Sequence, residues 1–318
     1  MNSRHRPFAA VRNAIAVSGL LVAVHANAQD AGPLALVLPI SARAASLGNA
    51  WVAGRDEYVI FHNPALVNTT AVPFGVSVGS FGRHAFSLAT VAGWTVGPIN
   101  FGWGVHVVNF SIPRTAAYPY SLRSVLGSGD ADVSSLQTVA AANMLWKGMR
   151  IGVGAKYAQD MAPHSVSATS SVVLPTRGSA ILADLGVSRP LLSGTAGLAV
   201  QNIAAPYSLG TQSVSVPTQI ALGWTALKQW GELDYGFATQ VMARRHGWIS
   251  PAAGLDVGYS WIEGYSMNGR VGARRPESKD ERPVSVGAAF NADRLNVEYG
   301  LGFFAGNERV HRLTLRWR

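Results

Sequence analysis

The chain has no cysteine among its 318 residues, and only 14% of its residues are charged. The absence of cysteine excludes a disulfide framework and a thiolate metal site. Soluble globular chains carry about 25% charged residues, so this chain is poor in charge. Its 48% hydrophobic content excludes intrinsic disorder. Beyond residue 28 it also lacks the run of about 18 apolar residues that a transmembrane helix requires.

The net charge of +9 is not gathered into a basic patch. Arg4, Arg6 and Arg12 lie at the very start of the chain, and the remaining basic residues are spread thinly. Nucleic-acid surfaces combine clustered Lys and Arg with aromatic residues, and no such run is present. Nucleic acid is therefore not an expected partner.

The first 28 residues have the pattern of an export signal. A positive start precedes the apolar stretch Ala14–Val24, which is too short to span a bilayer as a helix. Ala26 and Ala28 supply the small residues that signal peptidase requires, which predicts cleavage after Ala28. The alternative is a buried N-terminal helix. The sequence predicts a signal peptide over residues 1–28 and a protein that leaves the cytoplasm.

Apolar and polar residues alternate through most of the chain after residue 71. In residues 295–303, for example, Leu, Val, Tyr, Leu and Phe alternate with Asn, Glu and Gly. Strands of a membrane barrel show this period because one face meets lipid and the other a wetter interior. The pattern predicts an all-β protein, a transmembrane antiparallel β-barrel of about 14 strands over residues 72–318. Expected strand starts lie near Val72, His84, Pro98, Val133, Met149, Ser179, Gly194, Val216, Gly231, Trp248, Tyr265, Arg282, Arg294 and Arg309.

Weak alternation near Val133 and Ser179 leaves twelve or sixteen strands open, and a soluble β-sandwich is the competing fold. The connections favour the barrel, because even-numbered ones are short and long ones fall only at odd positions, as in bacterial barrels. Several tryptophans also map to the ends with short turns, where a girdle at the membrane interface is expected. They are Trp94, Trp146, Trp230, Trp261 and Trp317.

Residues 29–71 do not alternate and contain an unusual series of short motifs. A small-residue stretch from Ala42 to Ala53 is followed by Arg55-Asp56-Glu57, an aromatic stretch and Asn63-Pro64-Ala65. This series resembles the start of FadL-like and PorV-like (PorV/PorQ-type) outer-membrane barrels, over about 25 residues. The sequence departs from that pattern at Leu66, where glycine is usual, and at Arg55-Asp56-Glu57, where two acids with small residues are usual. The resemblance implies that residues 29–71 form a plug, or hatch, with short helices.

Within this segment, Arg43, His62, Asn63, Pro64 and Ala65 are the candidate ligand or hatch residues. Asn63 suits the cap of a short helix that begins at Pro64, since its side chain accepts from free N–H groups and proline lacks one. These residues either anchor the plug to the wall or take part in ligand passage. A buried Arg43 is expected to pair with a carboxylate of the lumen such as Asp234, Asp256 or Glu298.

Alternation also places several charges on the inner face of the barrel. Interior ion pairs that hold a narrow lumen are the favoured interpretation, and a selectivity device is the alternative. The eight histidines show no ligand spacing, so no metal site is expected, and no catalytic motif or cofactor-binding motif occurs. The expected lumen-lining charges are Arg150, Lys156, Asp184, Asp234, Asp256, Arg270, Glu298 and Arg316.

The sequence therefore indicates a non-enzymatic barrel of a Gram-negative bacterial outer membrane. Its general partners would be outer-membrane lipid and the barrel-assembly machinery. The FadL-like resemblance implies passive uptake of hydrophobic or amphipathic small molecules through a gap in the wall. The PorV-like resemblance implies instead an accessory barrel that receives secreted proteins. A structural surface barrel without transport is a further alternative, whereas the plug disfavours a general aqueous porin.

Overall fold

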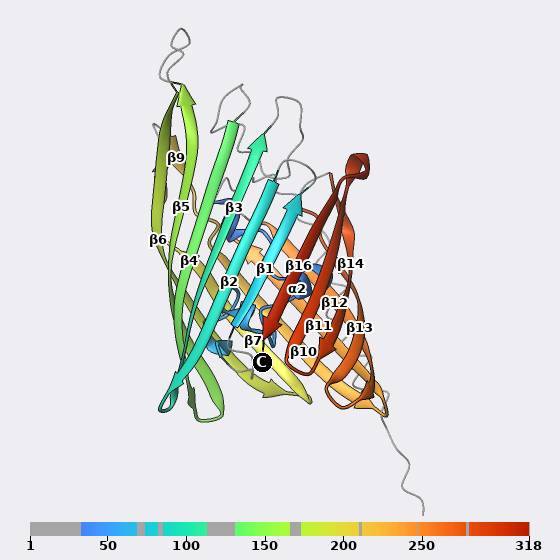
Figure 1. Cartoon of the computed structure of the whole chain (residues 1–318). Helices are drawn as coiled ribbons and strands as arrows, with labels where there is room; N and C mark the ends of the chain where they lie inside the picture. Colours follow the sequence, from blue (N-terminus) through green and yellow to red (C-terminus); the bar gives the residue numbers. More distant parts are fainter. Residues whose placement is uncertain are drawn as a thin grey trace, which may run out of the picture.

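The computed structural model describes residues 33–68, 74–81, 85–112, 131–165, 173–209, 212–245, 247–277 and 280–317. Fourteen antiparallel strands close into a barrel, in which β1 pairs with both β2 and β16 (Figure 1). The barrel strands are β1 (Phe74–Phe81), β2 (Ala85–Val96), β3 (Ile99–Ile112), β4 (Ala131–Trp146), β5 (Met149–Ser165), β6 (Val173–Leu191), β7 (Gly194–Ile203), β10 (Gln219–Trp230), β11 (Leu233–Arg244), β12 (Ile249–Ile262), β13 (Tyr265–Arg274), β14 (Glu281–Ala292), β15 (Leu295–Phe304) and β16 (Arg309–Trp317).

The predicted fourteen-stranded barrel is confirmed. Six connections, all even-numbered, are two-residue turns, such as Gly97–Pro98 and Gly231–Glu232, and they lie together at one end of the barrel, the turn end. Positive φ angles at Gly97, Lys147 and Gly231 fit such tight hairpins, whose twist matches that of the strands. The opposite end carries the longer connections and is the loop end (Figure 1). Among the described residues, no helix is long and apolar enough to cross a membrane.

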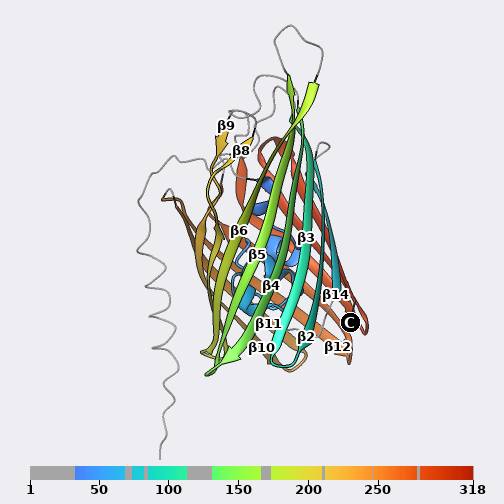
Figure 2. The ribbon, with the colours of Figure 1, turned by 90° about the vertical axis from the view of Figure 1, so that its left-hand side faces the viewer.

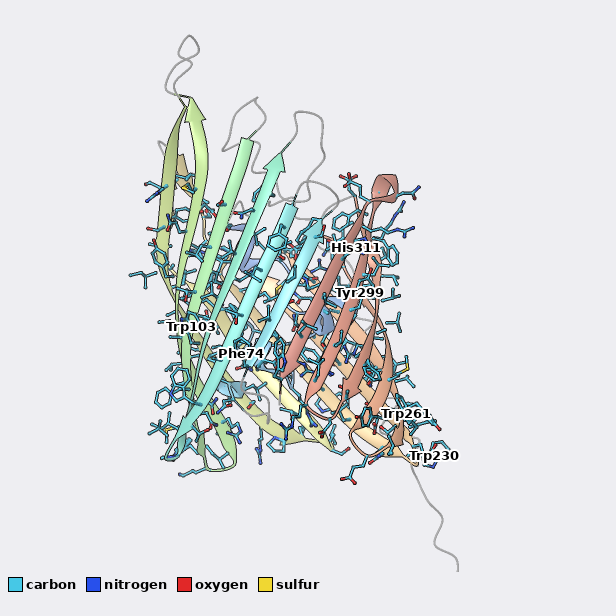
Figure 3. All side chains as sticks on the ribbon, in the orientation of Figure 1. Phe74, Trp103, Trp230, Trp261, Tyr299 and His311 are labelled. Carbon is cyan, nitrogen blue, oxygen red and sulfur yellow. The ribbon has the colours of Figure 1, made fainter. Side chains whose placement is uncertain are left out.

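The outer wall is apolar, as a wall that faces lipid requires. Each strand presents large exposed hydrophobic side chains, and Trp230 and Trp261 lie at the turn end in Figure 3. At the closure of the barrel, Phe74 of β1 pairs with Trp317 of β16, and their rings lie 5.8 Å apart. One exposed residue of each strand, in strand order, is Phe74, Leu88, Trp103, Met144, Val153, Ile181, Leu198, Leu222, Phe237, Leu255, Val271, Phe290, Tyr299 and Leu313.

Several strands on the loop side are longer than the sequence predicts. β6 begins at Val173 rather than near Ser179, and β5 runs to Ser165, so most of the loop expected from Met161 to Gly178 is strand. The register pairs Pro163 with Pro175, two residues that favour a loop in sequence-based reasoning. The expected loop from Ala204 to Ser215 contains a small hairpin, β8 (Tyr207–Leu209) with β9 (Gln212–Val214) (Figure 2).

Residues 33–68, the N-terminal segment, lie within the barrel and contain four short helices (Figures 1 and 2). η1 (Leu34–Leu36) contacts β3 and β4, and α2 (Ala42–Ser46) contacts β13 to β16. η2 (Glu57–Phe61) contacts β1 to β4, and η3 (Pro64–Leu66) contacts β4 to β6. Residues of this segment, including Tyr58 and Ile60, form an apolar cluster with inner-wall residues such as Val91 and Val139.

Side chains of the wall satisfy the irregular backbone of this segment. Gln240 of β11 accepts hydrogen bonds from the amides of Trp51 and Val52, at 3.0 and 2.8 Å. Asn143 of β4 donates to the carbonyl of Val67 at 2.7 Å. A segment with little helix or sheet would otherwise bury unpaired backbone groups, each costing about 1–3 kcal/mol. The polar inner face therefore stabilises the segment in place.

Candidate functional site

The Asn63–Ala65 turn sits against the inner wall on β5 and β6. The Asn63 Oδ1 atom accepts from the amide of Ala65 at 3.0 Å, so Asn63 caps η3 with Pro64 at its first position, as the sequence predicts. The Asn63 amide donates to the carbonyl of Val52 at 2.9 Å. The turn approaches Gly152 and Gly186 so closely that an added Cβ atom would lie 2.3 Å from the Ala65 amide nitrogen and 2.0 Å from Asn63 Oδ1, respectively. Only glycine fits at these two wall positions.

A buried ion pair lies beside this turn. The Lys156 ammonium of β5 contacts the Asp184 carboxylate of β6 at 2.7 Å, and both side chains are almost fully buried. Lys156 also donates to Asn202 Oδ1 at 3.1 Å and to the Phe61 carbonyl at 3.3 Å. Burial, with the Lys156 ammonium nearby, lowers the pKa of His62 to about 3, so its imidazole is neutral. The pair ties the end of η2 to the wall.

The wall is irregular next to this ion pair. The β6–β7 register shifts between Ala183, which faces Ile203, and Leu185, which faces Val200. Residues 201 and 202 form the bulge, and Asn202 has a φ of 58°. The Asn202 amide nitrogen donates to Asp184 at 2.7 Å, and the Gln201 side chain donates to the His62 carbonyl. A bulge interrupts ladder pairing and turns side chains toward a new direction.

A second charged cluster lies across the lumen, centred on Glu298 of β15. Its Oε1 atom is shared by three guanidinium groups, of Arg316 at 2.6 Å, Arg43 at 2.9 Å and Arg270 at 3.2 Å. Arg270 also contacts Asp256 at 2.7 Å. Arg43 belongs to α2, so its pairing with Glu298 fixes the N-terminal segment to the barrel. The Glu298 carboxylate is fully buried and is the acid that all three of these cations share.

Two acids of the N-terminal segment face the same cluster. Asp56 accepts from the Trp51 indole at 2.7 Å, whereas both carboxylate oxygens of Glu57 lack a hydrogen-bond partner among the described residues. The nearest guanidinium, of Arg316, is 3.6 Å from Glu57. Burial raises the pKa of Glu57 to about 8, and Arg316 only partly opposes this shift. Glu57 is therefore largely protonated at neutral pH.

The raised pKa of Glu57 predicts a loss of stability with rising pH. The folded protein binds one more proton than the unfolded chain between the ordinary pKa of 4.5 and about 8, so the unfolding free energy falls across this window. Urea unfolding followed by tryptophan fluorescence in detergent should show this decline, and Glu57→Gln should reduce it. Equal pH dependence in the two proteins would contradict the assignment.

The remaining lumen-lining candidates lie apart from both clusters. Arg150, at the turn end of β5, donates to Asn143 at 3.5 Å and is partly exposed. Asp234, on β11, accepts from Ser260 at 3.2 Å. The structure thus joins Arg43 with Asp256, Arg270, Glu298 and Arg316, and joins Lys156 with Asp184. It does not bring these two sets together with Arg150 or Asp234.

Sequence reasoning missed several residues that hold the N-terminal segment. Gln240, Asn143 and Asn202 bind its backbone or its neighbours, yet a single polar residue on an inward face gives no signal of its partner. Arg312 of β16 is also missed. It is fully buried and donates to the Ile40 carbonyl at 3.0 Å. Arg312 lies four residues before Arg316 on β16, so the alternation of the strand places both side chains on the inner face. That alternation could have identified Arg312.

Among the described residues, no group of three or more His, Asp or Glu side chains is arranged to hold a metal ion. The chemistry present consists of ion pairs and amide contacts between a segment and its wall. Such contacts position the segment.

Solved structures with the same fold include a hydrocarbon channel, a toluene transporter and a FadL homologue. The CymD monoaromatic hydrocarbon channel superposes with a TM-score of 0.61 at 9% identity, over 88% of this chain and 98% of that one. The toluene transporter TodX of Pseudomonas putida gives 0.55 at 10% identity, over 91% and 98%. A FadL homologue of Pseudomonas aeruginosa gives 0.54 at 10% identity, over 88% and 98%. No protein-family model and no curated protein matches in sequence. At these identities the likeness establishes the fold.

Proposed function

We propose that this protein is an outer-membrane channel for hydrophobic or amphipathic small molecules, with the N-terminal segment as its plug. The apolar outer wall supports placement in a bilayer. The shared fold with channels named for monoaromatic hydrocarbons supports this class of substrate. On this proposal, residues 1–28 act as a signal peptide that lies outside the described residues, and residues 29–71 and 72–318 are plug and barrel.

The observation that carries the proposal is that the N-terminal segment lies in the lumen next to a bulge in the β6–β7 pairing. The N-terminal segment contacts β1 to β6 and β13 to β16 from inside the barrel, and on this proposal it obstructs the passage of hydrated solutes along the bore. The β6–β7 bulge lies directly beside the Asn63–Ala65 turn. A hydrophobic molecule that leaves sideways at this bulge would enter the lipid without crossing the plug.

Lys156 and Asp184 have a definite role in this scheme. Their ion pair, with Asn202 and Gln201, holds the bulge and the end of η2 together. Arg43, His62, Asn63, Pro64 and Ala65 then anchor the plug and line its contact with the wall. The lumenal charges serve to hold the plug, and outer-membrane lipid and the assembly machinery are the general partners of such a barrel.

Uptake of radiolabelled toluene tests the proposal. The full-length chain is expressed in a Gram-negative host that lacks its own channel of this kind, and label retained by the cells is followed against time. We expect faster uptake of toluene than in empty-vector cells, with uptake of a hydrophilic sugar unchanged. Equal uptake of toluene with and without the protein would contradict the proposed channel function. It would favour an accessory role in protein secretion, or a structural barrel without transport.

A further inference from the structure

A row of arginines crosses the outer wall at the loop end. Arg274 and Glu281 form an ion pair on the inner face of the wall. Side chains alternate between the two faces of a strand, so the residues that follow them, Arg275 and Arg282, are neighbours on the outer face. Phe303 of β15 is adjacent to this position and pairs in register with Arg309 of β16. Arg275, Arg282 and Arg309 are all exposed. With strands about 4.8 Å apart, the row spans about 14 Å.

The row lies at the border of the apolar belt. His311 of β16 lies one outward-facing position further from the loops than Arg309, and Tyr299 of β15 lies two such positions further than Phe303. The polar atoms of Tyr299 and His311 are 2.5 Å apart (Figure 3). Aromatic residues with polar tips are typical of the interface between hydrocarbon and headgroups. The arginines beyond them are therefore at the depth of lipid headgroups.

The cations of this row are available to a partner. Within the described part of the chain, neither Arg282 nor Arg309 forms an ion pair. The Arg275 guanidinium stacks over the Trp248 ring at 4.1 Å and donates to the Ile249 carbonyl at 3.0 Å, which fixes its orientation without neutralising it. Among the described residues beside these three cations, Glu308, which precedes Arg309 in the chain, is an exposed acid, and Asp280 is a half-buried one.

Among the described residues, exposed cations and acids are more nearly balanced at the turn end, four against three. There the exposed cations alternate with exposed acids in the two-residue turns and their neighbours. They are Lys147, Arg189, Lys228 and Arg294, with Glu232, Glu263 and Asp293. The asymmetry between the two ends indicates a partner that is anionic and present on the loop side only.

We propose that Arg275, Arg282 and Arg309 form a binding surface for the phosphate groups of the glycolipid in the outer leaflet. Guanidinium groups bind phosphate oxygens through paired hydrogen bonds, and a row of three suits a headgroup with more than one phosphate. Phe303, between Arg282 and Arg309 in the row, offers an apolar contact to the adjoining acyl chains. This surface rests on the proposed outer-membrane placement, with the loops facing outward.

Native mass spectrometry of the full-length protein in detergent, titrated with diphosphorylated lipid A, tests this surface. The variant R275Q/R282Q/R309Q should bind about 100-fold more weakly than the parent, from about fivefold for each cation. The matched control R189Q/K228Q/R294Q removes three cations at the turn end and should bind as the parent does. Lipid A stripped of phosphate should bind the parent as weakly as lipid A binds the loop-end variant.

Equal binding of lipid A by the parent and the loop-end variant would overturn the proposal. So would equal binding of phosphorylated and stripped lipid A, because acyl chains alone would then account for it. Fractionation of the cells checks membrane placement separately, so a protein absent from the outer membrane would reveal a failure of the proposed function rather than of this surface. The substitutions lie on the outer face, away from the plug, so toluene uptake should be unchanged.

Discussion

Replacement of Glu298 by glutamine should lower the free energy of unfolding by about 3–5 kcal/mol, the usual cost of removing one partner from a buried ion pair. Glutamine has nearly the same size as glutamate, so the change removes charge with little change of volume. It leaves Arg43, Arg270 and Arg316 around a neutral group, with Asp256 still paired to Arg270 and with the Glu57 near Arg316 largely protonated. Urea unfolding in detergent measures the loss.

Asp234→Asn provides the matched control for this prediction. Asp234 is also an inward-facing acid of the barrel, but it is only half-buried, and its hydrogen bond is to the neutral Ser260. We expect a loss of less than about 1 kcal/mol, as for an ordinary hydrogen bond. If both variants lose the same free energy, the three arginines do not depend on Glu298 for their stability.

Gly152→Ala should open the plug while the barrel remains closed. The added Cβ would lie 2.3 Å from the Ala65 nitrogen and 2.4 Å from the Pro64 carbonyl carbon, which are backbone atoms that cannot rotate away. Overpacking of this kind typically costs about 1–3 kcal/mol, and displacement of the Asn63–Ala65 turn relieves it. We expect ion conductance in planar bilayers that the parent protein does not show.

Gly269→Ala is the control for this change. It introduces the same methyl group in a strand of the same barrel, where nothing lies within 4 Å of the added atom. Its conductance should equal that of the parent. A closed Gly152→Ala protein with unaltered stability would show that the turn does not need close contact with the wall.

The number of strands and their order could be predicted from sequence because every second residue of a strand faces lipid and is therefore apolar. Between Leu295 and Phe303 the outward positions are all apolar, since each meets hydrocarbon. The tight turns were equally visible, because Gly231 and Gly264 supply the positive φ that hairpins need. The cap at Asn63 follows from local chemistry alone.

The loop-side ends of β5 and β6 were not predictable in the same way. Beyond the hydrocarbon layer both faces of a strand meet water or loops, so the period of two disappears from the sequence. The sequence therefore predicts a loop for the residues from Val173 to Gly178, which the structure places in β6. These residues are a strand because they pair with β5, and the local sequence alone does not reveal which segments pair.

The partners within the lumen were predictable only by class. Arg43 was expected to find a carboxylate, but the choice of Glu298 over Asp234 or Asp256 depends on how α2 is placed against β15. Asp56 and Glu57 were part of the motif, yet their burial depends on the surrounding barrel. Such contacts join residues far apart in the chain and leave no periodic signal.

The segment that fills the barrel is the earliest part of the described chain, but its α2 helix contacts β13 to β16, the last strands to be made. The amide of Ala42 donates to Thr314, 272 residues away, and Arg43 meets Glu298. Contacts of such sequence separation are slow to form, because the intervening chain must first be organised. The segment therefore has to wait, without these partners, until β15 and β16 have been added and the cylinder is sealed. We therefore expect the α2 part of the segment to dock late in assembly, after the barrel has closed.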